Sequence, residues 1–136
     1  IIGNTCILLA KVTGIKESYK NFIGLDTGME TFMRPALYGA EHRIYKLGTK
    51  HETENLPVDI TGRICENTDR LAVNISFPRV VEGDLIAIMD AGAYGYAMSN
   101  QYNTRPRSAE ILVNGDEYHL IRSRETIEDI FQNCNI

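Results

Sequence analysis

Apolar and polar residues alternate along most of the chain, and this pattern predicts short β-strands. In the segment 5–15, Leu8, Ala10 and Val12 alternate with neighbours that would lie on the opposite face. Similar runs recur at 19–26, 42–47, 58–64, 71–75, 85–90, 107–113 and 117–122. Eight or nine short strands separated by turns favour a mainly β fold, an antiparallel β-barrel or sandwich with Greek-key-like connections.

Glycine and proline mark the expected turns and breaks. Asn114-Gly115 is the strongest hairpin signal, because a two-residue type I′ turn needs positive φ at both central positions. A helical turn at 29–33 would end before Pro35 and leave 35–40 irregular. The polar stretch 48–56, with His51, is predicted to be a surface loop. A short C-terminal helix is expected at 126–133, where acidic residues occupy the first turn.

Length and charge narrow the function classes. The 136 residues suit one domain, and 14 Lys and Arg against 18 Asp and Glu leave a net charge of −4. The basic residues are scattered, so nucleic acid is not an expected partner. The apolar runs fall far short of the roughly 20 residues of a membrane span. The chain begins at Ile1 and enters a strand almost at once, so we expect it to be part of a longer protein.

Cysteine and histidine spacing bears on compartment and metal binding. Three widely spaced cysteines form neither a disulfide framework nor a metal-binding motif, which fits a reducing cytoplasm. The histidines at 42, 51 and 119 are far apart, so no metal site is expected. Cys6 and Cys134 have no reactive neighbours and are predicted to be structural.

Cys65 and Glu66 are the first candidates for chemistry, because they follow a predicted strand at a polar bend. The alternative is that Cys65 is a small buried hydrophobic residue. Glu66 and Asp69 would be poor neighbours for a thiol in a core. Nearby negative charge favours the protonated thiol, so Cys65 suits a proton donor better than a thiolate nucleophile.

Arg34, Tyr38 and Tyr94 form a second candidate group. An arginine and a tyrosine four residues apart can offer a guanidinium and a phenol to a carboxylate ligand. The alternative is a surface ion pair and a core tyrosine. Tyr94 lies among small residues, where it is either accessible to a ligand or packed on its neighbours in a turn.

Several segments in order resemble the C-terminal domain of the diaminopimelate decarboxylases, pyridoxal-phosphate enzymes whose fold is shared with alanine racemase and the ornithine and arginine decarboxylases. The matching runs are LDTGM at 25–29, MRPALYGAEH at 33–42, GRICENTD at 62–69, EGDLIAIMDAGAYGYAMSNQYNTRPRSAEILV at 82–113 and IRSRET at 121–126. The family more often has Ser-Gly at 67–68 and Gly-Pro at 62–63. These differences lie beside the Cys-Glu pair and leave it intact.

The resemblance implies a role for each candidate residue. Cys65 would be the acid that returns a proton to the substrate after carbon dioxide leaves. Glu66 would contact the distal amino group of the substrate, Arg34 and Tyr38 its distal carboxylate, and Tyr94 the substrate and the pyridoxal 5'-phosphate cofactor.

The resemblance also implies partners. An N-terminal α/β barrel, not contained in residues 1–136, would supply the Schiff-base lysine, so this single C-terminal domain alone is expected to be inactive. The complete enzyme is expected to be a homodimer with active sites across the interface.

Two alternative functions remain at this point. One is decarboxylation of a related diamino acid, such as ornithine, lysine or a carboxylated polyamine like carboxynorspermidine. Arg34 with Tyr38 argues against substrates that lack a distal carboxylate. The other is a non-catalytic dimerisation or regulatory module, against which the intact set of candidate residues argues.

Overall fold

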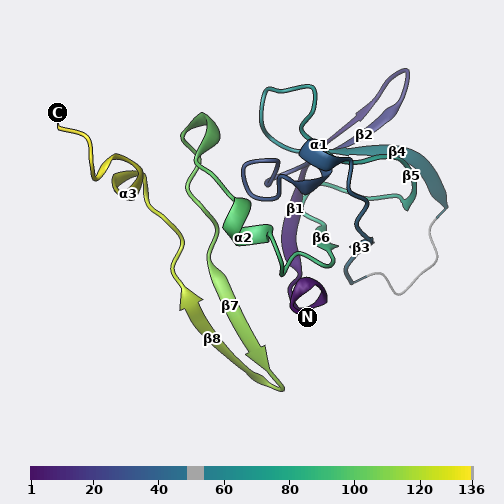
Figure 1. Cartoon of the computed structure of the whole chain (residues 1–136). Helices are drawn as coiled ribbons and strands as arrows, with labels where there is room; N and C mark the ends of the chain where they lie inside the picture. Colours follow the sequence, from purple (N-terminus) through teal and green to yellow (C-terminus); the bar gives the residue numbers. More distant parts are fainter. Residues whose placement is uncertain (49–53, 136) are drawn as a thin grey trace.

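A six-stranded sheet forms the body of the computed structural model, which describes residues 1–48 and 54–135. The strand order is β3-β6-β1-β2-β4-β5 (Figure 1). Its strands are β1 (Leu8–Glu17), β2 (Asn21–Leu25), β3 (Ile44–Lys46), β4 (Asn55–Thr61), β5 (Arg70–Pro78) and β6 (Leu85–Ile88). The predicted mainly β fold is therefore confirmed.

A second, two-stranded sheet consists of β7 (Glu110–Asn114) and β8 (Glu117–Arg122). The helical elements are short: η1 (Gly3–Thr5), α1 (Arg34–Tyr38), α2 (Gly95–Met98), η2 (Tyr102–Thr104) and α3 (Ile127–Phe131). Figure 1 shows β7, β8 and α3 extending away from the six-stranded sheet. No helix in residues 1–48 and 54–135 is both long and apolar enough to cross a bilayer.

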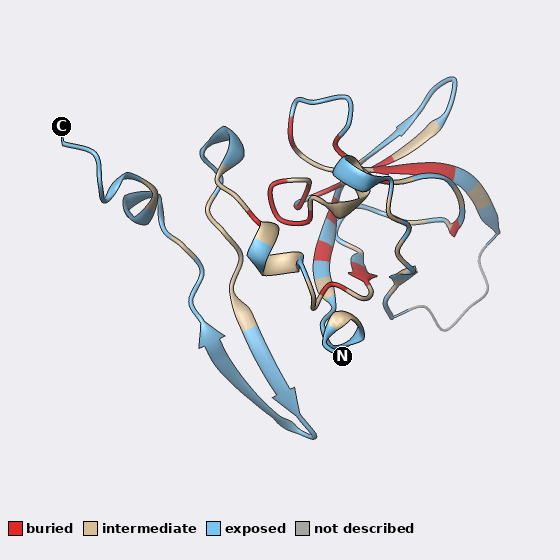
Figure 2. Cartoon of the chain, in the orientation of Figure 1, coloured by how far each residue is buried: buried red, intermediate tan, exposed pale blue. Residues whose placement is uncertain are grey.

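The core lies on one face of the six-stranded sheet, as the alternation predicts. In β1 the side chains of Ala10 and Val12 are buried, whereas those of Lys11 and Thr13 are exposed. Figure 2 shows the buried residues gathered on the sheet and on the loop after β2. The core residues are Ala10, Val12, Ile23, Leu25, Phe32, Val58, Ile60, Leu71, Phe77, Ile86, Ile88 and Ala91.

One strand pair departs from the antiparallel pattern. β1 pairs antiparallel with β2 and with β6, but β2 and β4 run parallel, with Asn21 opposite Val58. A parallel pair needs a long crossover, and here the connection contains α1 and β3. This crossover places α1 in contact with β5.

The predicted alternation fails in the middle of β5. Val73 was expected to share a face with Leu71 and Ile75, but it is 52% exposed. Asn74 has φ of +53°, and the pairing with β4 is irregular at this point. The register shifts twice, between Thr61 and Ile60 and again between Ile60 and Val58, and each shift places one extra residue in β5. An extra residue reverses the alternation, so the two shifts alter it around Val73 and restore it from Ile75 onward.

A helical turn forms close to where it was predicted, because the N–H groups of Thr31 and Phe32 donate to the Gly28 carbonyl, and it ends before Pro35. The segment 35–40 was predicted to be irregular, and this prediction is wrong. Helix α1 begins at Arg34, with Pro35 in its first turn. Proline is accepted there because the first backbone N–H groups of a helix have no partner within it. Gly39 ends the helix with φ of +62°, where its N–H donates to the carbonyl of Pro35.

The other boundary predictions are confirmed with shifts. The β7–β8 hairpin forms, but Asn114 pairs with Glu117, so the turn residues are Gly115 and Asp116. Gly115 supplies the positive φ, +61°, and Asn114 stays in the ladder. The C-terminal helix α3 forms with Thr126 as its N-cap. Most of the loop predicted at 48–56, including His51, falls outside the described residues, and 55–56 belong to β4.

Candidate functional site

Arg34 and Tyr38 lie at the two ends of α1. The helix follows a loop at 26–33 that leaves β2, so the sheet fixes where α1 starts. Positions i and i+4 of a helix lie on one face, so the guanidinium and the phenol share a face of α1. Tyr38 is 64% exposed. The predicted alternative of a core tyrosine is therefore wrong.

Tyr94 joins this pair from a distant segment. It lies at the N-cap of α2, and the Arg34 guanidinium carbon is 5.0 Å from the centroid of its ring. Arginine over an aromatic face is a favourable cation–π contact. Tyr94 remains 50% exposed, so its phenol is accessible.

Arg34 forms no ion pair with an acidic side chain in the described part of the chain. Its Nε is buried without a hydrogen-bond partner there. The alternative of a surface ion pair is therefore not supported. A cation held against a ring with no carboxylate paired to it is suited to bind an anionic group of a ligand.

Cys65 and Glu66 lie on the loop between β4 and β5, and both are exposed. The alternative of a buried structural thiol is thus wrong for Cys65. Its Sγ accepts a hydrogen bond of 3.5 Å from Nδ2 of Asn103, which lies in η2. The Glu66 carboxylate accepts a bond of 3.4 Å from the Thr68 N–H. A thiol and a carboxylate are therefore presented side by side on one loop.

The other two cysteines differ from expectation. Cys6 and Cys134 were predicted to be structural, yet both are exposed in this chain. Burial of its sulfur nevertheless raises the pKa of the Cys6 thiol, and the nearby Glu110 adds to this effect. Neither cysteine belongs to the group around Arg34 or to the loop of Cys65.

The sequence did not reveal what holds the Cys65 loop in place. Asp69 was interpreted as a charge beside the thiol, but its carboxylate is buried beneath the loop. Oδ2 accepts from the Ile64 N–H at 2.8 Å, and Oδ1 accepts from the Met29 N–H at 2.7 Å. Burial is the main reason that the pKa of Asp69 is raised. A carboxylate bonded to a backbone N–H group 40 residues away has no pattern that a sequence would show.

Three segments meet around Glu30, which is also buried. Its Oε1 accepts from Nε of Arg63 at 2.7 Å, and its carbonyl oxygen accepts from the N–H of Asn100 at 2.8 Å. The segments leading to Arg34 and to Cys65, and the one that follows α2, are thereby joined. In residues 1–48 and 54–135, no hydrogen bond, ion pair or aromatic contact links the Cys-Glu pair directly to the group around Arg34.

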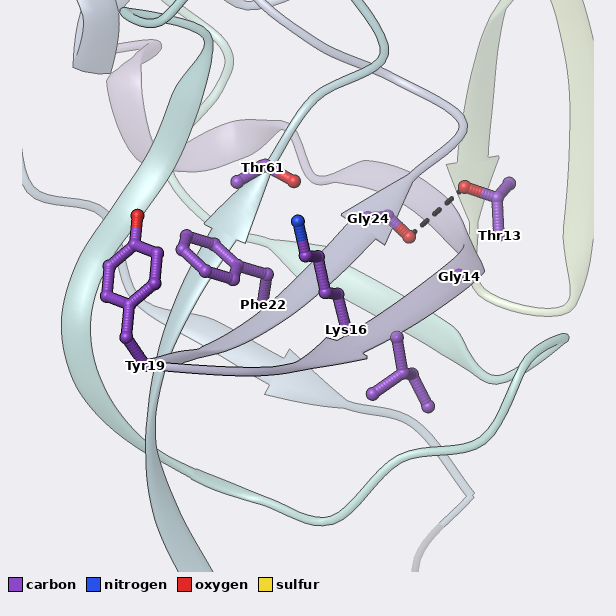
Figure 3. Close-up of a pocket in the computed structure, with 8 residues that line it drawn as sticks. Thr13, Gly14, Lys16, Tyr19, Phe22, Gly24 and Thr61 are labelled. Carbon is purple, nitrogen blue, oxygen red and sulfur yellow. Dashed lines mark hydrogen bonds between the residues drawn. The ribbon is translucent and has the colours of Figure 1, made fainter.

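A groove of about 410 Å³ lies elsewhere, on the β1–β2 hairpin (Figure 3). Lys16, Tyr19 and Phe22 line it with residues of β1, β2 and β4. The rings of Tyr19 and Phe22 meet edge to face at 5.7 Å. The groove contains none of the predicted site residues. In the described segments, no group of three or more His, Cys, Asp or Glu side chains is arranged to hold a metal ion.

Similarity to known proteins shows the family of this chain. Residues 1–92 match the family described as the C-terminal sheet domain of pyridoxal-dependent decarboxylases. The chain belongs to this family.

Three similar proteins illustrate the relationship of this sheet domain to longer chains. The diaminopimelate decarboxylase of Archaeoglobus fulgidus is 46% identical over 97% of this chain and 32% of its own length. That of Methanothermobacter thermautotrophicus is 42% identical over 100% of this chain and 32% of its own. The structure of diaminopimelate decarboxylase from M. jannaschii in complex with L-lysine superposes with a TM-score of 0.92, at 37% identity over 98% of this chain and 31% of that one. The sheet domain thus spans about a third of the length of these relatives.

The sheet domain offers one aromatic group to a pyridoxal cofactor. Tyr94 supplies a half-exposed phenol ring. This ring fits contact with a bound aromatic group. Two lysines of the described residues form ion pairs: Lys20 with the buried Asp59, and Lys46 with Asp84. Neither lysine belongs to the group of Arg34, Tyr38 and Tyr94.

Proposed function

We propose that this chain is the sheet domain of a diaminopimelate decarboxylase, which converts meso-2,6-diaminopimelate to L-lysine and carbon dioxide with pyridoxal 5'-phosphate. This reaction is the last step of lysine biosynthesis. The relatives that match nearly the whole chain support the proposal. The observation that carries the substrate assignment is the Arg34 guanidinium, held against Tyr94 without a carboxylate partner among the described residues.

Arg34 suits the feature that distinguishes diaminopimelate from lysine and ornithine. Diaminopimelate has a carboxylate at each end, whereas the other two have only an ammonium at the distal end. A guanidinium binds a carboxylate through two parallel hydrogen bonds, and the nearby Tyr38 phenol adds a donor. For a substrate without the distal carboxylate, Arg34 would place a cation close to an ammonium group.

Cys65 and Glu66 take the complementary roles. The bond between the substrate α-carbon and its carboxylate breaks, and carbon dioxide leaves without the bonding electron pair. The Cys65 thiol then gives its proton to that carbon, and the thiolate recovers a proton from solvent. The Glu66 carboxylate is an acceptor for the distal ammonium group. Exposure of both side chains agrees with these roles.

Pyridoxal phosphate, when bound, supplies the electron sink for decarboxylation. Tyr94 is the residue of this chain that we assign to contact with the cofactor and the substrate. We further propose that an N-terminal barrel supplies the lysine that holds the cofactor. The complete enzyme would be a cytoplasmic homodimer in which the Cys65 loop reaches the neighbouring subunit's barrel.

The test is a substrate panel with the full-length protein and pyridoxal phosphate. Carbon dioxide release should be fastest, by kcat/KM, with meso-diaminopimelate, and at least 100-fold slower with lysine or ornithine. Faster release from ornithine, lysine or a carboxylated polyamine would assign the protein to a related decarboxylase instead.

A Cys65→Ala variant tests the catalytic role. Loss of a positioned general acid should lower kcat by about 10²- to 10⁴-fold. Cys134→Ala is the matched control, because Cys134 is also exposed but lies outside the site. Unchanged kcat in Cys65→Ala would contradict the assignment, and no turnover of any substrate by the wild-type protein would favour a dimerisation module.

A further inference from the structure

Asp69 closes the Cys65 loop from below. It is 3% exposed, and its two carboxylate oxygens accept from different segments, the Ile64 N–H of its own loop and the Met29 N–H of the loop before α1. Within the loop, the Asp69 N–H donates to the carbonyl of Glu66, and the Gly62 N–H donates to the carbonyl of Asp69. The Asp69 backbone therefore joins the ends of the Cys65 loop, and the Asp69 side chain attaches the loop to the segment that leads to Arg34.

Glu30 adds a second connection between the same segments. The side chain is 1% exposed, with Oε1 bonded to Arg63 and Oε2 buried without a hydrogen-bond partner in the described part of the chain. Its backbone carbonyl accepts from Asn100, three residues before Asn103, whose amide donates to the Cys65 sulfur. Glu30 therefore bonds both to the Cys65 loop, through Arg63, and to the segment that carries Asn103, through Asn100.

The backbone closes tightly around these carboxylates. A Cβ at Gly28 would come within 2.5 Å of an Asp69 oxygen and 2.8 Å of a Glu30 oxygen. A Cβ at Gly62 would overlap the Asp69 carboxylate as well. Both positions therefore require glycine, for space rather than for positive φ. This geometry leaves the Asp69 side chain little freedom to move.

Stability alone does not account for the arrangement. Two buried carboxylates repel one another, and burial disfavours the charge on each. Buried charged groups are often no more stabilising than apolar side chains of the same volume. What the Asp69 carboxylate provides is directional: two short hydrogen bonds that define how one loop lies on another.

We propose that Asp69 is a positioning residue, which sets the place of the Cys65 thiol by attaching its loop to the segment that begins α1. Glu30 and Arg63 reinforce the attachment. The inference rests on the proposed function for the role of Cys65. The geometric part, an attachment between two loops, does not depend on that role and is tested separately below.

The test compares two variants of the full-length enzyme, Asp69→Asn and Asp59→Asn. Asparagine has one acceptor oxygen and an NH₂ group, so it cannot accept from both Ile64 and Met29. Asp59 is a matched control, because it is also buried, accepts from the Asn74 N–H at 2.8 Å and pairs with Lys20 and Arg70. The Asp59 side chain bonds to Lys20 in the β1–β2 turn and to Arg70 and Asn74 in β5, and to none of residues 62–69.

Two measurements read the attachment without activity. In Asp69→Asn, amide hydrogen exchange in peptides covering 26–33 and 62–69 should be at least tenfold faster. The rate at which iodoacetamide alkylates Cys65, read by mass spectrometry of the tryptic peptide 64–70, should change at least threefold. In Asp59→Asn, amide exchange should rise around Asn74. Exchange in 26–33 and 62–69 and the alkylation rate of Cys65 should stay within twofold of the wild type.

Kinetics then connect the attachment to catalysis. Asp69→Asn should lower kcat at least tenfold and change the KM for meso-diaminopimelate less than threefold, whereas Asp59→Asn should keep kcat within twofold. Equal loss of kcat in both variants, or unchanged exchange in Asp69→Asn, would overturn the proposal. If Asp69→Asn does not fold, Arg63→Gln, at a partly exposed position, should lower kcat several-fold, and an unchanged kcat would overturn it.

Failure of the proposed function would look different. A wild-type enzyme without activity on meso-diaminopimelate, combined with faster exchange in Asp69→Asn, would reject the substrate assignment and retain the attachment.

Discussion

Replacing Arg34 by methionine tests the substrate assignment most directly. The variant keeps an unbranched side chain that can pack against Tyr94, and it removes the cation. If Arg34 binds the distal carboxylate of diaminopimelate, its loss removes two charge-assisted hydrogen bonds of about 1.5–3 kcal/mol each. Because about 1.4 kcal/mol corresponds to a factor of ten, kcat/KM for diaminopimelate should fall by about 10²- to 10⁴-fold.

The same change should not lower the free energy of unfolding. The variant loses a cation–π contact of about 0.5–1 kcal/mol. It also removes a buried Nε that has no hydrogen-bond partner in the described segments, an arrangement that costs about 1–3 kcal/mol. The two terms oppose one another and differ by between zero and about 2.5 kcal/mol in favour of the variant, so the melting temperature should not fall below that of the wild type. A large fall in kcat/KM could then not be attributed to unfolding.

L-Lysine provides the internal control, because it lacks the distal carboxylate. Its inhibition constant, measured against diaminopimelate turnover, should change less than threefold in Arg34→Met. Arg79→Met is the matched control variant, because Arg79 is exposed and its one ion pair among the described residues, with Glu17, is long at 4.0 Å. A KM and kcat for diaminopimelate within threefold of the wild type, or an equal weakening of lysine and diaminopimelate binding, would refute the reasoning.

Three further predictions concern the fold and are read by chemical denaturation. Ile60→Ala, at a fully buried position, should lower the free energy of unfolding by about 2–5 kcal/mol, and a loss below 1 kcal/mol would contradict the core assignment. Gly62→Ala should destabilise markedly through overlap with Asp69, whereas Gly14→Ala, with open space around it, should be nearly neutral; equal effects would be inconsistent with the tight packing at Gly62. The hydrogen bond from Lys46 is the main cause that lowers the pKa of Asp84. The Asp84 carboxylate therefore stabilises the fold above its unfolded pKa of about 3.9, and this contribution is lost as the pH falls through the lower folded pKa. Asp84→Asn should therefore flatten the loss of stability below about pH 4, and an unchanged acid profile would count against the Lys46 contact.

The regular parts of the fold follow from the sequence because they depend on periodicity. Side chains in β1 alternate between core and solvent as expected, since a two-residue period leaves one choice of buried face. The N-terminus of α3 was also predictable, because Thr126 and Asp129 form a local capping box. Such signals need only residues close together in the chain.

The errors arose where a local rule had two outcomes. A proline disfavours the helical conformation in the residue before it but is accepted in the first turn, and at Pro35 the second rule prevailed. The bulge at Asn74 has no marker in the alternation of β5. Tertiary pairing decided both cases, and a single sequence does not display it.

The candidate site was predictable in its members but not in its support. Cys65 and Arg34 were found from residue type and from the family resemblance. Their contacts with Asn103 and Tyr94 come from segments about 40 and 60 residues further along the chain. Asp69 was noticed only as a charge, because nothing near it in sequence indicates that its carboxylate faces the Met29 N–H.

The central place of β1 in the sheet determines when the domain can be completed during translation. β1 pairs with β2 almost at once, but its other edge pairs with β6, where Leu8 lies opposite Ile88, 88 − 8 = 80 residues later. Until that segment leaves the ribosome, β1 carries an unpaired edge, which is the kind of surface that joins other chains. Slow synthesis between β2 and β6 should therefore favour aggregation of the nascent domain more than slow synthesis after β6.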